Sequence, residues 1–360
     1  MRSIKTPKLR FRAFNDDWQV KKLGDLLKVG SGRDYKHLSK GTIPVYGTGG
    51  LMLYVDDYLY DGKSICIGRK GTINKPQFLN GKFWTVDTLF YTYDYRDSIP
   101  EFLYLIFQNI NWLQYNEASG VPSLLKTTIE KIKVNVPHEN EQEKIANFLT
   151  QADNLIGLQQ KKLDLLKKYK QGLIQQIFSQ KPRFKDDNGK EYPEWEEKIL
   201  SDIAYSETSP LSANTIESRT GNYKVYGAAG ILQTLNTYHY ESEYIAVVKD
   251  GAGVGRIIFC EPKSSVLGTL IVVQPQKNID KKFLLFLMKQ INFKKYVTGS
   301  TIPHVYFKQY AKEKFTIPYL DEQKKIAEFL TALDDKVKLE ESKLEQAKQF
   351  KKALLQQMFV

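Results

Sequence analysis

The stretch PHENEQEKIANFLTQADNLIGLQQKKLDLLKKYKQGLIQQIFS, residues 137–179, is written twice in this chain. It returns without a gap as PYLDEQKKIAEFLTALDDKVKLEESKLEQAKQFKKALLQQMFV, residues 318–360, with 19 identities in 43 positions. Apolar residues recur in both copies at the 3.5-residue spacing that is typical of a coiled coil. We therefore predict two long helices that pack on each other. The alternative is an ordinary amphipathic helix that packs on its own globular domain.

Polar residues interrupt the apolar seam of these helices and predict how they pair. If the helices run antiparallel, Gln159 faces Lys351 and Lys170 faces Glu340, so every polar residue in the seam meets another polar one. A buried polar pair costs stability but fixes register and orientation. We therefore predict an antiparallel intramolecular coiled coil. About 38 residues at 1.5 Å each make a rod of about 57 Å, which would serve as a spacer.

Shorter echoes at nearly the same offset extend the repeat over the rest of the chain. VYG at 45–47 returns at 225–227, Gly71 after a strand-like run returns as Gly251, and a small-residue turn ending in Pro122 returns with Pro303. The globular parts differ almost everywhere else, which indicates one scaffold with two divergent binding surfaces. The predicted fold class is α+β, with two mixed α/β domains separated by the two helices. The predicted boundaries are 1–136 and 181–317 for the domains, and 137–180 and 318–360 for the helices.

The charge of the chain favours an anionic partner. The 360 residues hold 53 Lys+Arg and 41 Asp+Glu, a net charge of +12. Residues 141–180 carry +2 and residues 322–360 carry +1, so most of the excess lies on or beside the globular domains. Nucleic acid is the first candidate, because each phosphate neutralised by Lys or Arg releases counterions. An antiparallel pair of helices also relates the two globular parts by a pseudo-two-fold axis, as two half-sites on a duplex require, so we expect a double-stranded DNA target.

Composition also bears on location. No apolar run reaches the roughly 18 residues that a membrane span needs, and the basic start lacks the apolar core of a signal peptide. Cys66 and Cys260 have no CxxC spacing and are predicted to be buried core residues. These observations predict a cytoplasmic protein with no membrane partner.

The sequence does not have the residue spacing that known catalytic motifs require. Gly62-Lys63-Ser64 resembles the end of a P-loop, but Asp57 stands where the first glycine is needed. The glycines at 251, 253 and 255 are read as a tight turn. The four histidines are scattered and form no metal-ligand spacing. The chain is therefore predicted to be non-catalytic, with no cofactor and no metal of its own.

Candidate DNA contacts are polar side chains on the expected loops, because base edges and phosphates are read by such groups. Solvated hairpin tips are the alternative for any one of them. In the first domain the candidates are Thr48, Arg69, Lys70, Thr72, Asn74, Lys75 and Ser119. In the second they are Lys249, Arg256, Ser300, Thr301 and His304.

Three motifs give the chain a family resemblance. They are the proline followed by EQxKIAxFL at 141–149 and its copy at 322–330, VYGTGG at 45–50, and SGVPSL at 119–124. Together they resemble the specificity subunit of type I restriction-modification systems over the whole chain. The second copy departs from the pattern with VYGAAG at 225–230 and STIPHV at 300–305, which blurs the transfer of turn roles there.

The resemblance implies how the chain works in a complex. It implies that each globular part is a target recognition domain for one half of the DNA target, and that the helices set the gap between the halves. It implies two modification subunits that carry the S-adenosylmethionine chemistry, and restriction subunits that use ATP and Mg²⁺. It also places partner-docking candidates at Glu141, Gln142, Glu322 and Gln323. Two alternatives remain at this stage, a protein-only coiled-coil adaptor and an enzyme that acts on DNA by itself.

Overall fold

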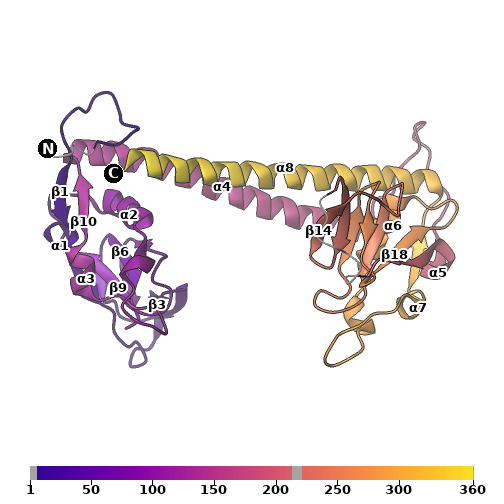
Figure 1. The fold of residues 1–360 in the computed structure, drawn as a ribbon, viewed down its shortest axis with the longest axis horizontal. Helices are drawn as coiled ribbons and strands as arrows, with labels where there is room; N and C mark the ends of the chain where they lie inside the picture. Colours follow the sequence, from indigo (N-terminus) through magenta and orange to yellow (C-terminus); the bar gives the residue numbers. More distant parts are fainter. Residues whose placement is uncertain (1–5, 213–220, 360) are drawn as a thin grey trace. The chain divides into compact units, whose positions relative to one another are not determined.

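The computed structural model describes residues 6–212 and 221–359. The outer bounds of the first predicted domain and of the second predicted helix, residues 1 and 360, therefore lie outside the described residues. The structure separates into two compact units (Figure 1). Unit 1 comprises Met1–Lys161 and Ser342–Val360, and unit 2 comprises Lys162–Glu341. Each unit therefore holds one globular domain and part of both long helices, which are α4 (Glu139–Phe178) and α8 (Leu320–Met358).

The globular domain of unit 1 combines two four-stranded sheets with a two-stranded ribbon. The sheets have the strand orders β2-β9-β6-β7 and β4-β3-β8-β5, and the ribbon is β1-β10. The elements are β1 (Gln19–Lys22), α1 (Leu23–Leu26), β2 (Lys28–Ser31), β3 (Lys40–Gly47), β4 (Gly50–Val55), β5 (Tyr60–Asp61), β6 (Ser64–Gly68), β7 (Gln77–Leu79), β8 (Lys82–Thr85), β9 (Leu89–Tyr93), α2 (Pro100–Asn109), η1 (Trp112–Tyr115), α3 (Lys126–Lys131) and β10 (Lys133–Val136).

The globular domain of unit 2 repeats this topology with one strand fewer in the second sheet, within the residues that the structure describes. Its sheets have the orders β12-β18-β15-β16 and β14-β13-β17, and its ribbon is β11-β19. The elements are β11 (Glu196–Ile199), α5 (Leu200–Ile203), β12 (Ala204–Thr208), β13 (Tyr223–Gly227), β14 (Gly230–Leu235), β15 (Tyr244–Val248), β16 (Ile257–Cys260), β17 (Ser265–Val266), β18 (Leu270–Pro275), α6 (Lys281–Met288), η3 (Phe293–Tyr296), α7 (Phe307–Tyr310) and β19 (Lys314–Ile317). The predicted fold class is confirmed.

One strand in each domain is buried on both faces. All five residues of β6 and all five of β15 are buried. Because successive side chains of a strand point to opposite faces, Ile65 and Ile67 enter the core beside the helices, while Cys66 enters a second core. Cys66 and Cys260 are free buried thiols, and burial raises the pKa of each to about 12. Burial on both faces explains the near-continuous apolar run around Cys66, whereas Cys260 ends β16, whose other residues are half-buried.

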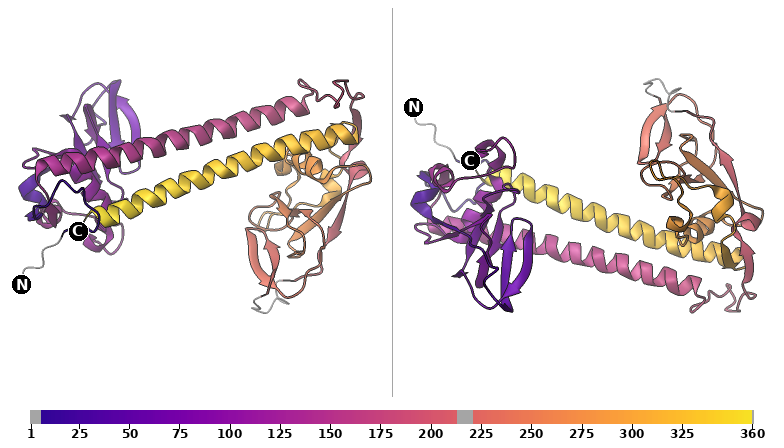
Figure 2. Two further views of the ribbon diagram at one scale, coloured as in Figure 1. Left: turned by 90° about the horizontal axis from the view of Figure 1, so that it is seen from above. Right: turned by 90° about the horizontal axis from the view of Figure 1, so that it is seen from below.

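The heptad pattern correctly identifies the buried face of both helices. On α4 the seam residues Ile145, Leu149, Leu163 and Ile177 are at most 3% exposed, and on α8 Ile326, Leu330, Leu344 and Met358 are at most 5% exposed. Within unit 1 the start of α4 pairs with the end of α8, and within unit 2 the end of α4 pairs with the start of α8 (Figure 2). The helices are therefore antiparallel within each unit, as predicted.

Both seam lysines form ion pairs with aspartates of the facing helix that the predicted register pairs do not include. Lys351 bonds Asp153 at 2.6 Å, and Lys170 pairs with Asp334. Glu340 forms an ion pair with Lys162 at 3.0 Å. A long lysine side chain can leave the seam and reach a carboxylate nearer the start of the partner helix. The pairs Gln159–Lys351 and Lys170–Glu340 stay a prediction.

The globular domain supplies a third residue to each lysine–aspartate pair. In unit 1 Lys351 also donates to Gln108, the last residue but one of α2, at 2.9 Å. In unit 2 Lys289 directly follows α6, and its Nζ lies 3.8 Å from Oδ2 of Asp334. The two trios occupy matched positions of the repeat, so the same arrangement ties both helices to the adjacent domain.

The four predicted docking residues are buried, which corrects the expectation that they face a partner. Glu141 and Glu322 are at most 2% exposed, and so are Gln142 and Gln323. They cannot receive another protein because the domain in front of each helix already covers them.

Each buried glutamate binds an arginine from the segment that precedes its domain. Arg10 donates two hydrogen bonds of 2.7 Å to Glu141, and Arg183 donates bonds of 3.0 and 3.1 Å to Glu322. The next residue, Phe11 or Phe184, makes an edge contact with a phenylalanine on the same helix. Such two-pronged charged contacts fix geometry as well as adding energy. The segment therefore clasps the start of the helix.

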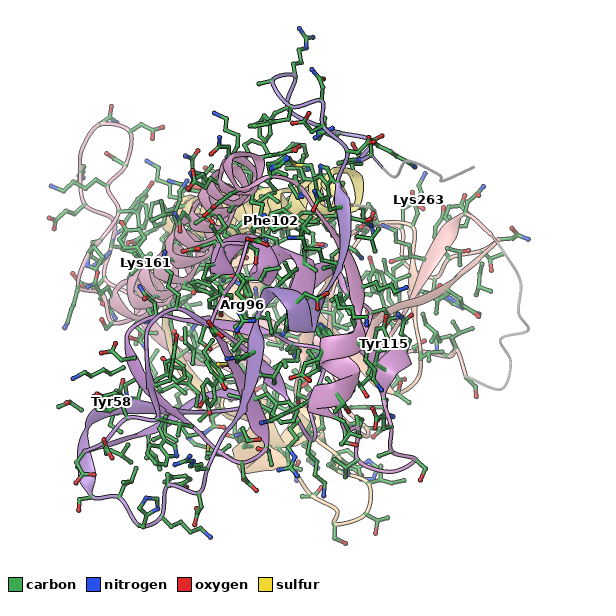
Figure 3. All side chains as sticks on the ribbon, turned by 90° about the vertical axis from the view of Figure 1, so that its left-hand side faces the viewer. Tyr58, Arg96, Phe102, Tyr115, Lys161 and Lys263 are labelled. Carbon is green, nitrogen blue, oxygen red and sulfur yellow. The ribbon has the colours of Figure 1, made fainter. Side chains whose placement is uncertain are left out.

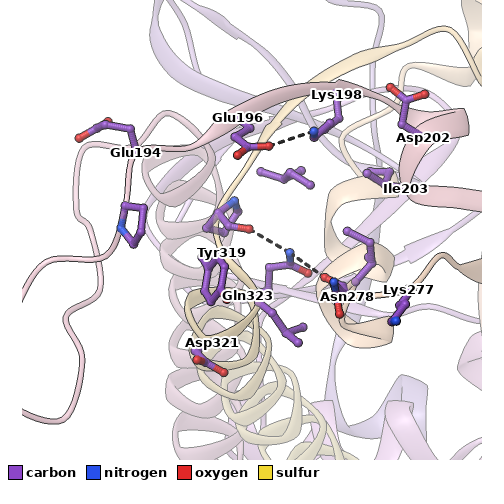
Figure 4. A pocket seen from close by; sticks show the side chains of 15 residues that line it. Glu194, Glu196, Lys198, Asp202, Ile203, Lys277, Asn278, Tyr319, Asp321 and Gln323 are labelled. Carbon is purple, nitrogen blue, oxygen red and sulfur yellow. Dashed lines mark hydrogen bonds and ion pairs between the residues drawn. The ribbon is translucent and has the colours of Figure 1, made fainter.

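Each buried glutamine joins the domain to the same helix turn. Gln323 donates to the backbone carbonyls of Pro318 and Asn278 (Figure 4). Its side-chain oxygen accepts from the Asp280 amide. Gln142 makes the matching bonds to Pro137, Asp97 and Ile99 in unit 1. The EQ motif is thus a structural joint.

The helix α2 faces the long helices, and the β3–β4 hairpin lies at the other end of unit 1 (Figure 1). Phe102 on α2 lies beside the long helices, whereas Tyr58 lies away from them (Figure 3). No helix in the parts of the chain that the structure describes is both long and apolar enough to cross a membrane.

Glu141→Gln tests the clasp. Removing the buried charge leaves Arg10 without its partner, so we expect the free energy of unfolding of unit 1 to fall by about 3 kcal/mol. Hydrogen exchange resolved by peptide should show faster exchange in β1, β10 and the start of α4. Glu139→Gln, at an exposed neighbouring position, is the matched control and should change little. Equal exchange in both variants would contradict the clasp.

Candidate nucleic-acid interface

Three loops that are distant in sequence meet in unit 1. They are the 47–50 turn between β3 and β4, the 69–75 segment after β6, and the 116–124 loop before α3. The Gly71 amide donates to the Pro122 carbonyl at 2.8 Å, and Leu124 donates to Arg69 at 2.9 Å. A Cβ placed on Gly71 would lie 3.9 Å from the Thr48 hydroxyl, so the turn adjoins the other two loops. We call these residues the first platform.

The same three loops meet in unit 2. They are the 227–230 turn, the 249–256 segment and the 298–305 loop, and we call them the second platform. Gly251 donates to the Pro303 carbonyl at 2.9 Å, and Val305 donates to Lys249 at 2.9 Å. The Arg256 guanidinium donates to the Ala228 carbonyl at 2.7 Å and so binds the turn to the segment. The two platforms share one backbone design.

The residues that survive in both halves of the sequence are the ones that build this design. Gly71 and Gly251 have φ values of 93° and 83°, a left-handed conformation that glycine adopts without strain. The amides of Arg69 and Lys70 both donate to the Thr88 carbonyl, and Lys249 and Asp250 both donate to Thr269. The short echoes in the sequence are therefore loop supports, while the surrounding side chains are free to differ.

Every candidate from the sequence lies on one of the platforms. Arg69, Lys70, Asn74, Lys75 and Ser119 are exposed on the first, where Thr48 and Thr72 are half-buried. On the second platform Arg256, Ser300 and Thr301 are exposed, and Lys249 and His304 are half-buried. The structure thus brings each group together within its own domain.

Sequence reasoning missed Asp250, which organises the second platform. Its carboxylate pairs with Lys249 and accepts a 2.8 Å hydrogen bond from Nδ1 of His304. Burial would raise the pKa of Asp250, but the hydrogen bonds from Lys249 and His304 outweigh it and hold that pKa below its ordinary value. The repeat contained a signal, because Asp250 stands where the first half has Lys70.

The two platforms therefore differ in charge although they share a backbone. Lys70 is an exposed cation, whereas its counterpart is an anion that neutralises Lys249. Two surfaces with the same backbone supports and different charges are suited to two different ligands. Within residues 6–212 and 221–359, no group of three or more His, Cys, Asp and Glu is placed to hold a metal ion.

Comparison with known proteins gives a consistent result. The family model described as "Type I restriction modification DNA specificity domain" matches residues 15–168 and again 192–349. The chain is similar to the type I restriction enzyme MjaVIII specificity subunit of Methanocaldococcus jannaschii, with 24% identity over 94% of this chain and 91% of that one. It is also similar to the MjaIX specificity subunit of the same organism, with 24% identity over 94% and 92% of the two chains.

Solved structures share the fold. The S subunit of a type I restriction-modification system from M. genitalium matches with a TM-score of 0.69 and 17% identity, covering 99% of both chains. A chain from a structural study of type I complex assembly and conformational transition matches with a TM-score of 0.53 and 13% identity, covering 94% and 96%.

Asp250→Asn tests the charge arrangement of the second platform. The change frees the Lys249 ammonium for a phosphate, so affinity for DNA of arbitrary sequence should rise several-fold at low salt. The slope of log affinity against log salt should steepen by up to about 0.9. Glu328→Gln removes the same charge at an exposed site on α8 in unit 2 and is the matched control. Titration with fluorescent duplex at several salt concentrations measures both, and equal effects would show only a change of net charge.

Proposed function

Because this chain belongs to the family of type I restriction-modification DNA specificity subunits, we propose that each platform reads one half of a bipartite DNA target. The chain is a non-catalytic subunit with two target recognition domains. It carries no cofactor, and S-adenosylmethionine and ATP belong to the partner subunits. Mg²⁺ is assigned to those partners as part of the same proposal.

One observation carries the proposal. The two platforms repeat the same backbone hydrogen bonds, Gly71 to Pro122 and Gly251 to Pro303, and present different polar side chains on them. A support repeated in both halves fixes where side chains are held, and the side chains that differ decide which base edges they match. This combination is expected of a protein that uses the same loop arrangement to recognise two different DNA sequences.

The side chains have distinct proposed roles. Exposed Arg69, Lys70 and Asn74 are placed to contact base edges or phosphates, and Lys75 to contact phosphates. Thr48, Thr72 and Ser119 supply hydroxyl groups at the same loops. On the second platform Ser300 and Thr301 are proposed to contact the DNA directly, whereas Lys249, Arg256 and His304 already have protein partners and position the loops.

The helices are proposed to set the distance between the two half-sites and to bind partners. In this division, 1–136 and 181–317 are the recognition domains, and 137–180 and 318–360 are the spacer. Exposed apolar side chains on both helices are proposed to receive two modification subunits, through which restriction subunits join. They are Leu155, Leu158, Leu165 and Tyr169 on α4, and Leu339 and Phe350 on α8.

Two buried reduced thiols accord with a proposed cytoplasmic location, where the chain would meet its DNA. A protein-only adaptor would also have paired helices with exposed apolar residues. It would give no reason for two platforms with the same supports and different charges, and so the DNA function is preferred.

Lys70→Ala tests the division of labour between platforms. The variant is compared with the original chain in complex with the modification subunits. If Lys70 contacts a base, the binding free energy should fall by about 1–3 kcal/mol. If it contacts a phosphate instead, the slope of log affinity against log salt should fall by about 0.9. Competition with duplexes in which one half-site is scrambled shows which half is affected. Only one half-site should respond, because Lys70 lies on one platform.

Lys133→Ala is the matched control, since Lys133 is an exposed lysine of unit 1 on β10. It should leave both half-sites unchanged. A response of both half-sites to Lys70→Ala, or no response of either, would count against the proposal that each platform reads one half of the DNA target.

A further inference from the structure

Each platform displays one aliphatic side chain at the tip of its third loop. Val121 and Ile302 stand directly before the prolines that accept hydrogen bonds from Gly71 and Gly251. Each is 55% exposed to solvent. The two residues occupy the same position of the repeat and have the same exposure, although the loops around them differ in sequence.

The loops that carry these side chains are closed at their base. In unit 1 the Glu117 amide donates to Ser123 at 3.1 Å, and the Asn116 side chain accepts from the Ser123 amide at 2.9 Å. In unit 2 Thr298 and His304 exchange backbone bonds of 2.9 and 2.7 Å. The tip is therefore held in position before any ligand arrives, which lowers the entropy cost of using it.

Further exposed apolar residues recur at matched positions on the strands that follow the two turns. Leu51 and Met52 on β4 are 51% and 53% exposed, and Ile231 and Leu232 on β14 are 57% and 58% exposed. Exposed apolar side chains that recur at matched positions are expected where another molecule is contacted. The ligand is DNA rather than protein because, on the first platform, the tip is hydrogen-bonded to the segment that carries exposed Arg69 and Lys70, which suit an anionic partner.

The shared side chain points to a contact that does not depend on sequence. Side chains that read bases should differ between the platforms, as Lys70 and Asp250 do. A contact with a thymine methyl group would be specific for one base and would have no reason to recur. Insertion between stacked bases needs no hydrogen-bond match to a base edge, and aliphatic side chains are among the groups that proteins use for it.

Building on the proposed function, we propose that Val121 and Ile302 are wedges that each open one base step within a half-site. A methyltransferase must take its target base out of the stack, which costs unstacking energy. A wedge held by the specificity subunit supplies part of that opening before the partner acts. On the first platform the exposed cations Arg69 and Lys70 of the neighbouring segment hold the phosphates beside the opened step.

The test uses the full chain with its modification subunits and target duplexes that carry 2-aminopurine at successive positions other than the methylated base. Emission should rise at one step in each half-site on binding. Val121→Ala should reduce the rise at least about fivefold in one half-site and leave the other unchanged, and Ile302→Ala should do the reverse. Val20→Ala, a 64% exposed valine on β1, is the matched control and should alter neither.

Methylation gives an independent readout. Val121→Ala should slow methylation of one half-site about tenfold, and a mismatch at the opened step should restore the rate to within about threefold, because a mismatched base is already easier to extrude. Unchanged emission in both variants, or a defect that the mismatch does not rescue, would overturn the wedge and leave only a direct contact such as one to a thymine methyl group. Binding without any rise in emission would also overturn the wedge while preserving the proposed function, whereas failure of the complex to bind the duplex would overturn both.

Discussion

The structure depends on the way each domain core is completed by the end of the helix that starts in the other half of the chain. In unit 1 Phe359 stacks on Phe102 at 5.4 Å and makes an edge contact with Trp18. In unit 2 Phe178 packs on Phe283 at 5.8 Å. Truncating such a residue leaves a cavity that costs several kcal/mol. Neither domain core is therefore complete without residues from both halves of the sequence.

This constraint fixes the base of each domain and leaves its far end free to vary. The arginine clasp, the buried glutamine and the lysine–aspartate pair all lie where a domain meets the long helices, and all recur in both units. The platforms lie on loops supported by a few repeated glycine, threonine and proline positions. A domain that is held this firmly where it meets the helices tolerates different residues at its far end, such as Lys70 in one domain and Asp250 at the matched position of the other. Two recognition surfaces can therefore diverge on one fold.

Much of this was predictable from the sequence because the determinants are local or repeated. The heptads gave the buried helix faces, and the echoes at Gly71, Pro122 and their copies marked the loops that meet. The partners of Lys170 and Lys351 were not predictable, since they depend on the reach of a long side chain and on Gln108 or Lys289 from another element. The burial of Glu141 was missed because its partner Arg10 lies far away in the sequence. Asp250 was missed because acidic residues are not sought at a DNA interface.

The central claim is that each platform reads one half of the DNA target. Its most direct test is a map of methylated sites in a genome that carries this chain with its modification subunits. We predict a motif of two short defined blocks separated by a gap of unspecified bases. Exchanging the 45–124 region for that of a relative with another specificity should change one block and preserve the other block and the gap. A single uninterrupted motif, or a change of both blocks on the exchange, would contradict the account.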